Sequence, residues 1–281
     1  MRELPASQIS DAVKYLFLKA NFHAGEDIMK ALKNARNREI SPTGKTVLSM
    51  IIENNEIASQ EEIALCQDTG LAVVFAEIGQ EVHITGGDFR EAVNEGVRAA
   101  YSEGFLRKSA VDDPLFDRKN TKTNTPAIIY TDIVPGDGIA FTVTPKGFGS
   151  ENMSALAMLT AADGPEGVVQ FVVDTVIKAG PNPCPPSVIG VGIGGTADLA
   201  MVMAKKATTR TIDEQNRDSR YAALEREILE KINNSGIGPA GLGGTVTALA
   251  VNIEHFPTHI AGMPVAVNIC CHAARHAQGV L

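Results

Sequence analysis

The chain has 281 residues, of which 44% are hydrophobic, 21% charged and 5% aromatic, and it carries a formal net charge of −8. This composition excludes a low-complexity or fibrous chain and supplies enough apolar residues for a sizeable core. The negative charge argues against a general nucleic-acid-binding protein, which needs a basic surface, but it does not exclude a small anionic ligand beside a local Arg or Lys cluster.

The first sixty residues are predicted to be helical. Apolar residues recur every three or four positions over 9–20 and again over 28–35, as they do on one face of a helix. Pro42 suits the first turn of a third helix. The apolar positions on the inner face of that third helix are Val47, Met50 and Ile51. We expect these helices to form a layer that packs on a sheet and carries no chemistry.

The next part of the chain is predicted to contain strands with one helix between them. A strand is expected over 71–78, and residues 82–84 are a candidate partner for it beyond a Gly-Gln turn. A helix is expected over 88–103. Strands over 127–134 and 139–144 flank a Pro-Gly-Asp-Gly turn, which is typical of a hairpin. A hairpin inside an alternating pattern favours a mixed sheet.

The second half of the chain continues the alternation. Strands are expected over 187–191 and 245–252, a further apolar run covers 264–269, and helices are expected over 167–179, 197–207 and 216–233. No linker composition or internal repeat divides the chain. We therefore predict a single α/β domain over residues 1–281, in which the helical region 1–60 packs with a mixed β-sheet.

Two glycine-rich segments, 190–195 and 236–241, match the pattern G-x-G-x-x-G of dinucleotide-binding proteins. The first follows a strand and precedes a helix, and Asp213 or Glu214 lies near the distance expected of a ribose-binding acid. Its late position and the prolines that precede its strand argue against this interpretation. Glycines also let backbone amides approach an anion or a metal cluster. An NAD-dependent oxidoreductase remains a distant alternative.

Three of the four cysteines, Cys66, Cys184 and Cys271, lie at the margins of predicted strands, where functional residues of α/β proteins collect. Three soft thiolate ligands suit an iron–sulfur cluster better than a single reactive thiol does. Zinc is the competing metal, although the spacing lacks the short paired steps of a zinc finger. The same pattern is compatible with buried cysteines that carry no chemistry, or with a non-catalytic cluster carrier.

Five segments resemble motifs of the class I fumarase/tartrate dehydratase family, the oxygen-sensitive iron–sulfur hydro-lyases. They keep the family's order and cover most of the chain beyond residue 60. The resemblance is to the family's N-terminal half, which in some members is a separate α subunit paired with a β subunit. The segments are Cys66-Gln67-Asp68-Thr69-Gly70, Leu106-Arg107-Lys108-Ser109, Lys146-Gly147-Phe148-Gly149-Ser150, Cys184-Pro185-Pro186 leading into Gly192-Ile193-Gly194-Gly195, and Asn268 to Ala277.

The resemblance implies that Cys66, Cys184 and Cys271 bind a [4Fe–4S] cluster whose fourth iron is open. The family's last motif, Cys followed by three residues and Arg-His-Ala, matches Cys271 to Ala277 and makes Cys270 the additional thiol. An open iron is a Lewis acid that can polarise a C–O bond. The sequence alone does not decide between Cys270 and Cys271, and we expect Cys271.

The resemblance also implies a reaction, the reversible hydration of fumarate to malate, with L-tartrate dehydration as the alternative. Asp68 and His259 match catalytic positions, while Gln67, Arg107 and Gly149 match substrate-binding positions. An Arg fork can clamp a substrate carboxylate, and an Asp can move a proton. Without the resemblance, Asp68 would be read as a loop cap, His259 as a core imidazole and Arg107 as a surface cation. Residues near the cluster motifs without an assigned role are Lys146, His272, Arg275 and His276.

A C4 dicarboxylate substrate and a β subunit follow from the same resemblance, as does a dimer of heterodimers. The chain ends at Leu281, soon after the last motif, as expected if a partner completes the site; the chain alone is then expected to be inactive. No signal peptide or membrane-spanning run is apparent, so we expect a cytoplasmic enzyme that binds neither membrane nor nucleic acid.

Overall fold

The computed structural model describes residues 1–281 and contains two compact units. The first comprises Met1–Gly25, Asn55–Phe148 and Arg275–Leu281, and the second Glu26–Asn54 and Gly149–Ala274. Helices and mixed sheets build both units, so the predicted mixed α/β class is confirmed. Because each unit collects segments that are distant in the sequence, no single cut of the chain separates them. The assignment of 1–281 to one domain stays a prediction.

The first unit contains a mixed sheet with the strand order β10-β5-β2-β4. Its central strand β2 runs parallel to β4 and antiparallel to β5, and β10 adds a further antiparallel strand at the other side of β5. Alternate residues of β2, such as Ala72 and Val74, enter the hydrophobic core, as expected of a pleated strand. The strands are β2 (Leu71–Gly79), β4 (Ile128–Val134), β5 (Ile139–Lys146) and β10 (Ala277–Val280).

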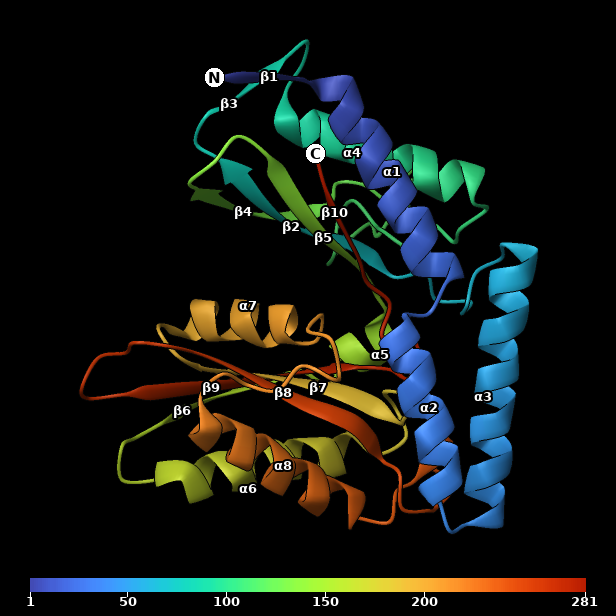
Figure 1. Cartoon of the computed structure of the whole chain (residues 1–281), viewed down its shortest axis with the longest axis vertical. Helices are drawn as coiled ribbons and strands as arrows, with labels where there is room; N and C mark the ends of the chain where they lie inside the picture. Colours follow the sequence, from blue (N-terminus) through green and yellow to red (C-terminus); the bar gives the residue numbers. More distant parts are fainter. The chain divides into compact units, whose positions relative to one another are not determined.

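Helices α1 (Ala6–Phe22) and α4 (Phe89–Glu103) lie against each other over this sheet (Figure 1). Their contact is close because Gly96 has no side chain: a Cβ there would lie 2.5 Å from the Ser10 carbonyl oxygen. Asp88 caps α4 by accepting a hydrogen bond from the Glu91 amide at 2.9 Å. The apolar periodicity that predicted α1 therefore corresponds to its buried face.

Both strand pairings predicted from local turns are wrong. The strand β3 (Val82–Thr85) pairs in parallel with β1 (Arg2–Pro5), a strand that the sequence did not predict, and not with β2. Likewise β4 and β5 do not form a hairpin, because β2 lies between them. The cause of both errors is the same: β2 is bonded on both edges, so β3 has no free edge to join, and the strands around the 135–138 turn are held apart.

The second unit contains a mixed sheet with the order β6-β9-β7-β8. Strand β7 runs parallel to β8 and antiparallel to β9, and every residue of β7 is buried. Helices α6 and α8 cover one face of the sheet and α7 covers the other (Figure 1). These elements are β6 (Ala155–Leu159), α6 (Gly164–Ala179), β7 (Ser187–Gly194), α7 (Ala197–Ala207), α8 (Ser219–Asn233), β8 (Ala248–Phe256) and β9 (Met263–Cys270).

The glycines of β7 permit a close approach of α7. A Cβ on Gly190 would lie 1.9 Å from the Ala204 carbonyl oxygen, and one on Gly192 would lie 2.1 Å from the Ala200 carbonyl oxygen. No larger residue fits at either position without displacing backbone. The first G-x-G-x-x-G match therefore lies mostly within a strand that a helix covers, rather than in a loop after the strand.

The predicted N-terminal helices are present, but they are shared between the units: α1 belongs to the first and α2 (Glu26–Arg38) to the second. Helix α3 (Pro42–Glu61) contributes residues to both, with the division after Asn54. The inner face of α3 also differs from the prediction, since Met50 is 63% exposed. Ile51 is buried as predicted, and Leu48 and Ile52 share the buried face with it.

The carboxylate of Glu39, just after α2, joins two segments of the second unit that are 206 positions apart in the sequence. The side chain is 1% exposed and accepts hydrogen bonds from the amides of Ile40, Ser41, Thr245 and Val246. Burial opposes the charge of this carboxyl, but the four backbone donors outweigh it and lower the pKa of Glu39 below its usual value.

Across the whole chain, no helix combines the length and the apolar character needed to cross a lipid bilayer.

Candidate functional site

The loop that leads into β2 holds Asp68 in a fixed orientation within the first unit. Its Oδ1 accepts a hydrogen bond from the Gly70 amide at 3.0 Å, and its Oδ2 accepts one from the Phe148 amide at 2.8 Å. A Cβ on Gly147 would lie 3.2 Å from Asp68 Oδ2, so a side chain there would press on the carboxylate. Both carboxylate oxygens are thus oriented by backbone donors.

Arg275 holds the backbone of this loop in place. Its guanidinium donates to the Asp68 carbonyl at 2.6 Å and to Asn21 Oδ1 at 3.2 Å, and its own carbonyl accepts from Thr144 Oγ1 at 2.9 Å. The residue is 3% exposed. Sequence analysis placed Arg275 in the last motif without a role, and the structure shows that it positions the Asp68 backbone.

Three further side chains join the Asp68 loop to the segment that carries Arg107. Thr69 Oγ1 donates to the Arg107 carbonyl at 2.8 Å, and the Tyr101 hydroxyl donates to the Thr69 carbonyl at 2.6 Å. Asn124, fully buried, donates to the Gly70 carbonyl at 3.0 Å. Burial raises the pKa of Tyr101 far above its usual value, so the phenol stays a neutral donor.

A pocket of about 570 Å³ opens between these segments, and Asp68 and Arg107 both line it. The Arg107 guanidinium has no hydrogen-bond or ion-pair partner in the protein, so all five of its N–H donors are available to an anion. The structure therefore brings together two of the predicted site residues. The other lining residues are Gly70, Leu71, Ser109, Ala110, Val111, Asp112, Pro114, Arg118, Pro126 and Phe148.

In the second unit, Cys184 lies in a rigid turn before β7. Its φ of +55° is in the left-handed region, and its amide donates to the Pro181 carbonyl at 3.0 Å. The short helix η1 (Pro239–Gly241), part of the second glycine-rich loop, braces this turn, because the Ala240 amide donates to the Pro185 carbonyl at 2.8 Å. The side chain of Cys184 is exposed.

Cys271 lies next to this turn. The register of β7 and β9 places Val188 opposite Cys270, and the His272 amide donates to the Cys184 carbonyl at 3.2 Å. Cys270 is 7% exposed within β9, whereas Cys271 follows the strand and is half-buried. None of the four cysteines forms a disulfide.

The donor set of the second unit fits a thiolate-bound cluster in part. Cys184 and Cys271 form no disulfide and lie on segments joined by a backbone hydrogen bond, and free thiols are the groups that bind iron–sulfur clusters. Cys66 belongs to the first unit, where its thiol donates to Gln67 Oε1 at 3.4 Å. No group of three or more His, Cys, Asp or Glu side chains is gathered around a metal position. The three-cysteine ligand set stays a prediction.

The remaining predicted residues do not line the pocket of Asp68 and Arg107. Gly149, in α5 (Phe148–Glu151), lies near the Cys184 turn, since a Cβ on it would be 3.2 Å from the Asn182 carbonyl oxygen. Gln67 follows Cys66 and does not line the pocket. His259 is exposed and lies in the loop between β8 and β9. The hydroxyl of the preceding residue, Thr258, donates a hydrogen bond to the carbonyl of Gly195, which directly follows β7.

The full length of β9 therefore separates His259 from Cys271. Eight residues of strand at about 3.3 Å each span roughly 25 Å. Within one chain the imidazole therefore lies far from Cys184 and Cys271, and the catalytic role of His259 stays a prediction. Counting positions from Cys271 could not reveal this, because an extended strand moves its two ends apart.

The comparisons with known proteins support the family that the motifs indicate. The family model for fumarate hydratase (Fumerase) matches residues 10–280. The chain belongs to the fumarate hydratase (Fumerase) family. This membership confirms the predicted class I fumarase/tartrate dehydratase family, N-terminal-half type, and supports a hydro-lyase.

Curated relatives of this Fumerase-family chain carry a more specific name. It is 47% identical over 276 residues to the putative L(+)-tartrate dehydratase subunit alpha of Methanocaldococcus jannaschii, and the match covers 96% of each chain. It is 33% identical to L(+)-tartrate dehydratase subunit alpha of Escherichia coli strain UTI89, with 91% of this chain and 84% of the relative covered. The same subunit of strain K12 is 31% identical.

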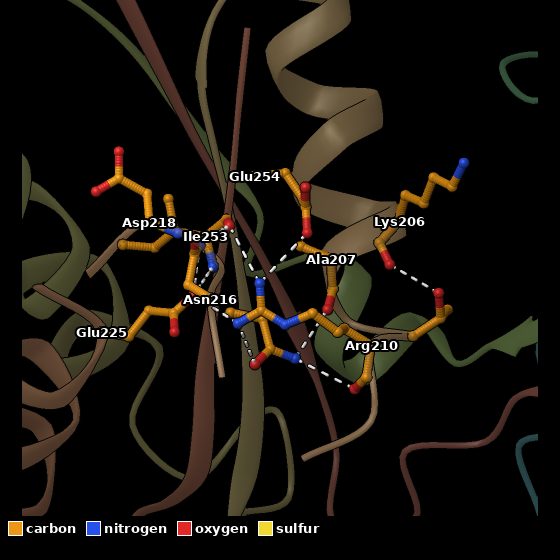
Figure 2. Close-up of polar contacts among 10 residues, drawn as sticks. Lys206, Ala207, Arg210, Asn216, Asp218, Glu225, Ile253 and Glu254 are labelled. Atoms are coloured by element: carbon orange, nitrogen blue, oxygen red, sulfur yellow. Dashed lines mark hydrogen bonds and ion pairs between the residues drawn. The ribbon is translucent and has the colours of Figure 1, made fainter. Parts of the chain in front are cut away.

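Asp213, the first of the two acids considered for a dinucleotide ribose, has a structural partner. Asp213 pairs with Lys30 of α2 at 2.6 Å, and the Ile212 amide beside it donates to Asp27. Arg210 anchors the same loop through Glu225, Glu254 and the Ile253 carbonyl, as Figure 2 shows. The close contact of β7 with α7 explains why glycines occur in the motif, and the ion pairs and hydrogen bonds of the 210–213 loop give its residues a structural role. Neither feature of this Fumerase-family chain requires a nucleotide.

Proposed function

We propose that the chain is the α subunit of an L(+)-tartrate dehydratase, which removes water from a C4 dicarboxylate. The sequence motifs favour fumarate hydration, with tartrate dehydration as the alternative. The names of the relatives, at 47% and 33% identity over nearly the whole chain, favour the alternative. The observation that carries the proposal is the pocket in which Asp68 and the unpartnered Arg107 guanidinium meet.

In this proposal Arg107 binds a substrate carboxylate. Its planar guanidinium forms two parallel hydrogen bonds with a carboxylate, which fixes the orientation of a small dicarboxylate as well as its position. Thr69 Oγ1 donates a hydrogen bond to the Arg107 carbonyl, which fixes the backbone position from which the guanidinium reaches the substrate.

Asp68 moves the proton. Dehydration of tartrate removes a proton from one carbon and the hydroxyl from its neighbour, which leaves an enol that becomes a keto acid. A carboxylate within hydrogen-bond reach of the C–H carbon can accept that proton. The amides of Gly70 and Phe148 hold both oxygens of Asp68 in a defined plane, as a proton-transfer group requires.

Cys184 and Cys271, with Cys66 as the third thiolate, would hold the [4Fe–4S] cluster. When bound, its open iron supplies a Lewis acid for the departing hydroxyl. Gln67 and Gly149 are further substrate contacts in this proposal. Gln67 lies beside Cys66, and Gly149 lies near the Cys184 turn.

A β subunit is the proposed partner, because the relatives are named as α subunits. We infer that it supplies the remaining substrate contacts and that the working assembly is a dimer of heterodimers in the cytoplasm.

The test is anaerobic production of the chain together with its β subunit, followed by assays with L-tartrate, D-tartrate, malate and fumarate. We expect the highest kcat/KM with L-tartrate, no turnover by the α subunit alone, and roughly a hundredfold or greater loss of kcat in Asp68→Asn. If the complex instead has the highest kcat/KM with fumarate and malate, the protein is a fumarate hydratase subunit and not a tartrate dehydratase subunit. Full activity of the α subunit without a partner would contradict the two-subunit site.

A further inference from the structure

Among the other polar side chains of the pocket that holds Asp68 and Arg107 is Ser109, to which the family resemblance gives no role. Ser109 lies two residues after Arg107 and lines the same pocket. Its hydroxyl oxygen has no hydrogen-bond partner in the protein and is shielded from solvent, while the residue as a whole is half-buried. A buried hydroxyl without a partner is unusual and calls for an explanation.

The backbone of Ser109 is fixed although its side chain is not. Asn124 Oδ1 accepts hydrogen bonds from the amides of Ser109 and Ala110, at 2.8 and 3.0 Å, while its amide group donates to the Gly70 carbonyl. Asn124 therefore holds Ser109 at a constant place relative to the Asp68 loop. The Ser109 hydroxyl can change direction by rotation about the Cα–Cβ bond between staggered positions, with no movement of the backbone.

The charges around the pocket favour an anionic occupant at this position. Asp68 and Asp112 are already engaged by backbone amides of Gly70, Phe148 and Asp113, so their negative charge is partly compensated. The Arg107 guanidinium is not engaged. A carboxylate offers about four acceptor positions, and a guanidinium fork occupies two of them. A neighbouring hydroxyl donor can take a third.

We propose that the Ser109 hydroxyl donates a hydrogen bond to the substrate carboxylate that Arg107 clamps, which makes Ser109 a substrate-binding residue. The inference rests on the proposed function in that it takes the occupant to be a C4 dicarboxylate. Binding gives the buried hydroxyl a partner that the protein itself does not provide, and the hydrogen bond helps to select a carboxylate over an uncharged group.

The same loop supplies a matched control. Thr121 also has a buried hydroxyl without a partner, and its amide donates to the Ala110 carbonyl at 2.9 Å, but it does not line the pocket. Thr121→Val removes this hydroxyl without changing the shape of the side chain. Any general effect of deleting an unpartnered hydroxyl from this loop will appear in both variants.

The experiment measures kcat and KM of the cluster-loaded α–β complex with L-tartrate, malate and fumarate, together with melting temperatures with and without L-tartrate. Ser109→Ala is expected to raise KM about tenfold, to change kcat less, and to weaken the thermal shift caused by L-tartrate. Thr121→Val is expected to match the wild type in KM. Ser109→Cys, which keeps the size but donates weakly, is expected to resemble Ser109→Ala.

An unchanged KM in both Ser109→Ala and Ser109→Cys, in a complex that is active as wild type, overturns the role of Ser109. An equal rise of KM in Thr121→Val also overturns it, because the effect would then belong to the loop as a whole. A wild-type complex that acts on none of the three dicarboxylates is a different result, which refutes the proposed function itself.

Discussion

The two adjacent cysteines at the end of β9 have different surroundings, and the difference bears on which of them binds iron. Cys270 is buried within the strand opposite Val188, whereas Cys271 follows the strand beside the Cys184 turn and is half-buried. A thiolate ligand needs access to the cluster, which a side chain packed inside a sheet does not have.

Replacing each of these cysteines by Ser separates their roles. Cys271→Ser is expected to lose most of the bound iron and the visible absorption of the reconstituted complex, while Cys270→Ser is expected to keep both and to lose about 1–2 kcal/mol of stability, because it buries a hydroxyl in place of a thiol. Iron analysis and thermal unfolding of the two variants measure this. The assignment fails if Cys270→Ser is the variant that loses iron.

At the level of residues, sequence reasoning found the side chains with recognisable chemistry and missed those that position them. Asp68 and Arg107 were predicted from motifs and do share a pocket. Asn124 and Tyr101 lie outside every motif, and only the tertiary structure brings their hydrogen bonds to the Asp68 loop. His259 lies in the loop before β9, away from the cysteines at the other end of that strand, and its catalytic role stays a prediction.

At the level of elements, periodicity predicted where helices and strands lie but not which strands pair. The strands β2, β4 and β5 were all predicted, yet the insertion of β2 between the other two depends on long-range contacts that no local turn signal reveals. The strands β1, β6 and β10 were missed; each has only four or five residues and shows little of an alternating pattern, and β3, equally short, was predicted from the turn that precedes it.

The contact of β7 with α7 provides a test at this scale. Gly192→Ala places a Cβ 2.1 Å from the Ala200 carbonyl oxygen, so either the helix or the strand must move, and we expect a loss of about 3 kcal/mol or more in the free energy of unfolding. Gly262→Ala is the control, because no atom lies within 4 Å of the added Cβ, and it should change stability by less than about 0.5 kcal/mol. Urea unfolding measures both. Equal midpoints would show that α7 does not pack as closely as the structure indicates.

At the level of the whole molecule, distant parts of the chain are interleaved in both units. The last residues complete the sheet of the first unit through β10, and residues 26–54 belong with the second half of the chain. Composition and periodicity could not predict this arrangement, because neither carries information about contacts between residues so far apart in the sequence. The carboxylate of Glu39 makes one such contact, since it joins the end of α2 to the amides of Thr245 and Val246.

Glu39 therefore links the pH to the stability of the second unit. Its pKa is lowered in the folded chain, so its carboxylate stabilises the fold fully above the unfolded pKa of about 4.3, and this contribution is lost as the pH falls through the folded value. Glu39→Gln keeps the size but gives up the charge and one acceptor, and we expect it to cost roughly 2–4 kcal/mol at pH 7. Between about pH 5 and pH 3 the unfolding free energy of the wild type should fall more steeply than that of the variant, so the two curves of unfolding free energy against pH should converge.

Urea unfolding across this range measures the difference, with Glu53→Gln on the exposed face of α3 as the control for removal of a carboxylate. If the unfolding free energies of the wild type and Glu39→Gln instead change in parallel with pH, the charge of Glu39 does not stabilise the fold through the amides of Thr245 and Val246.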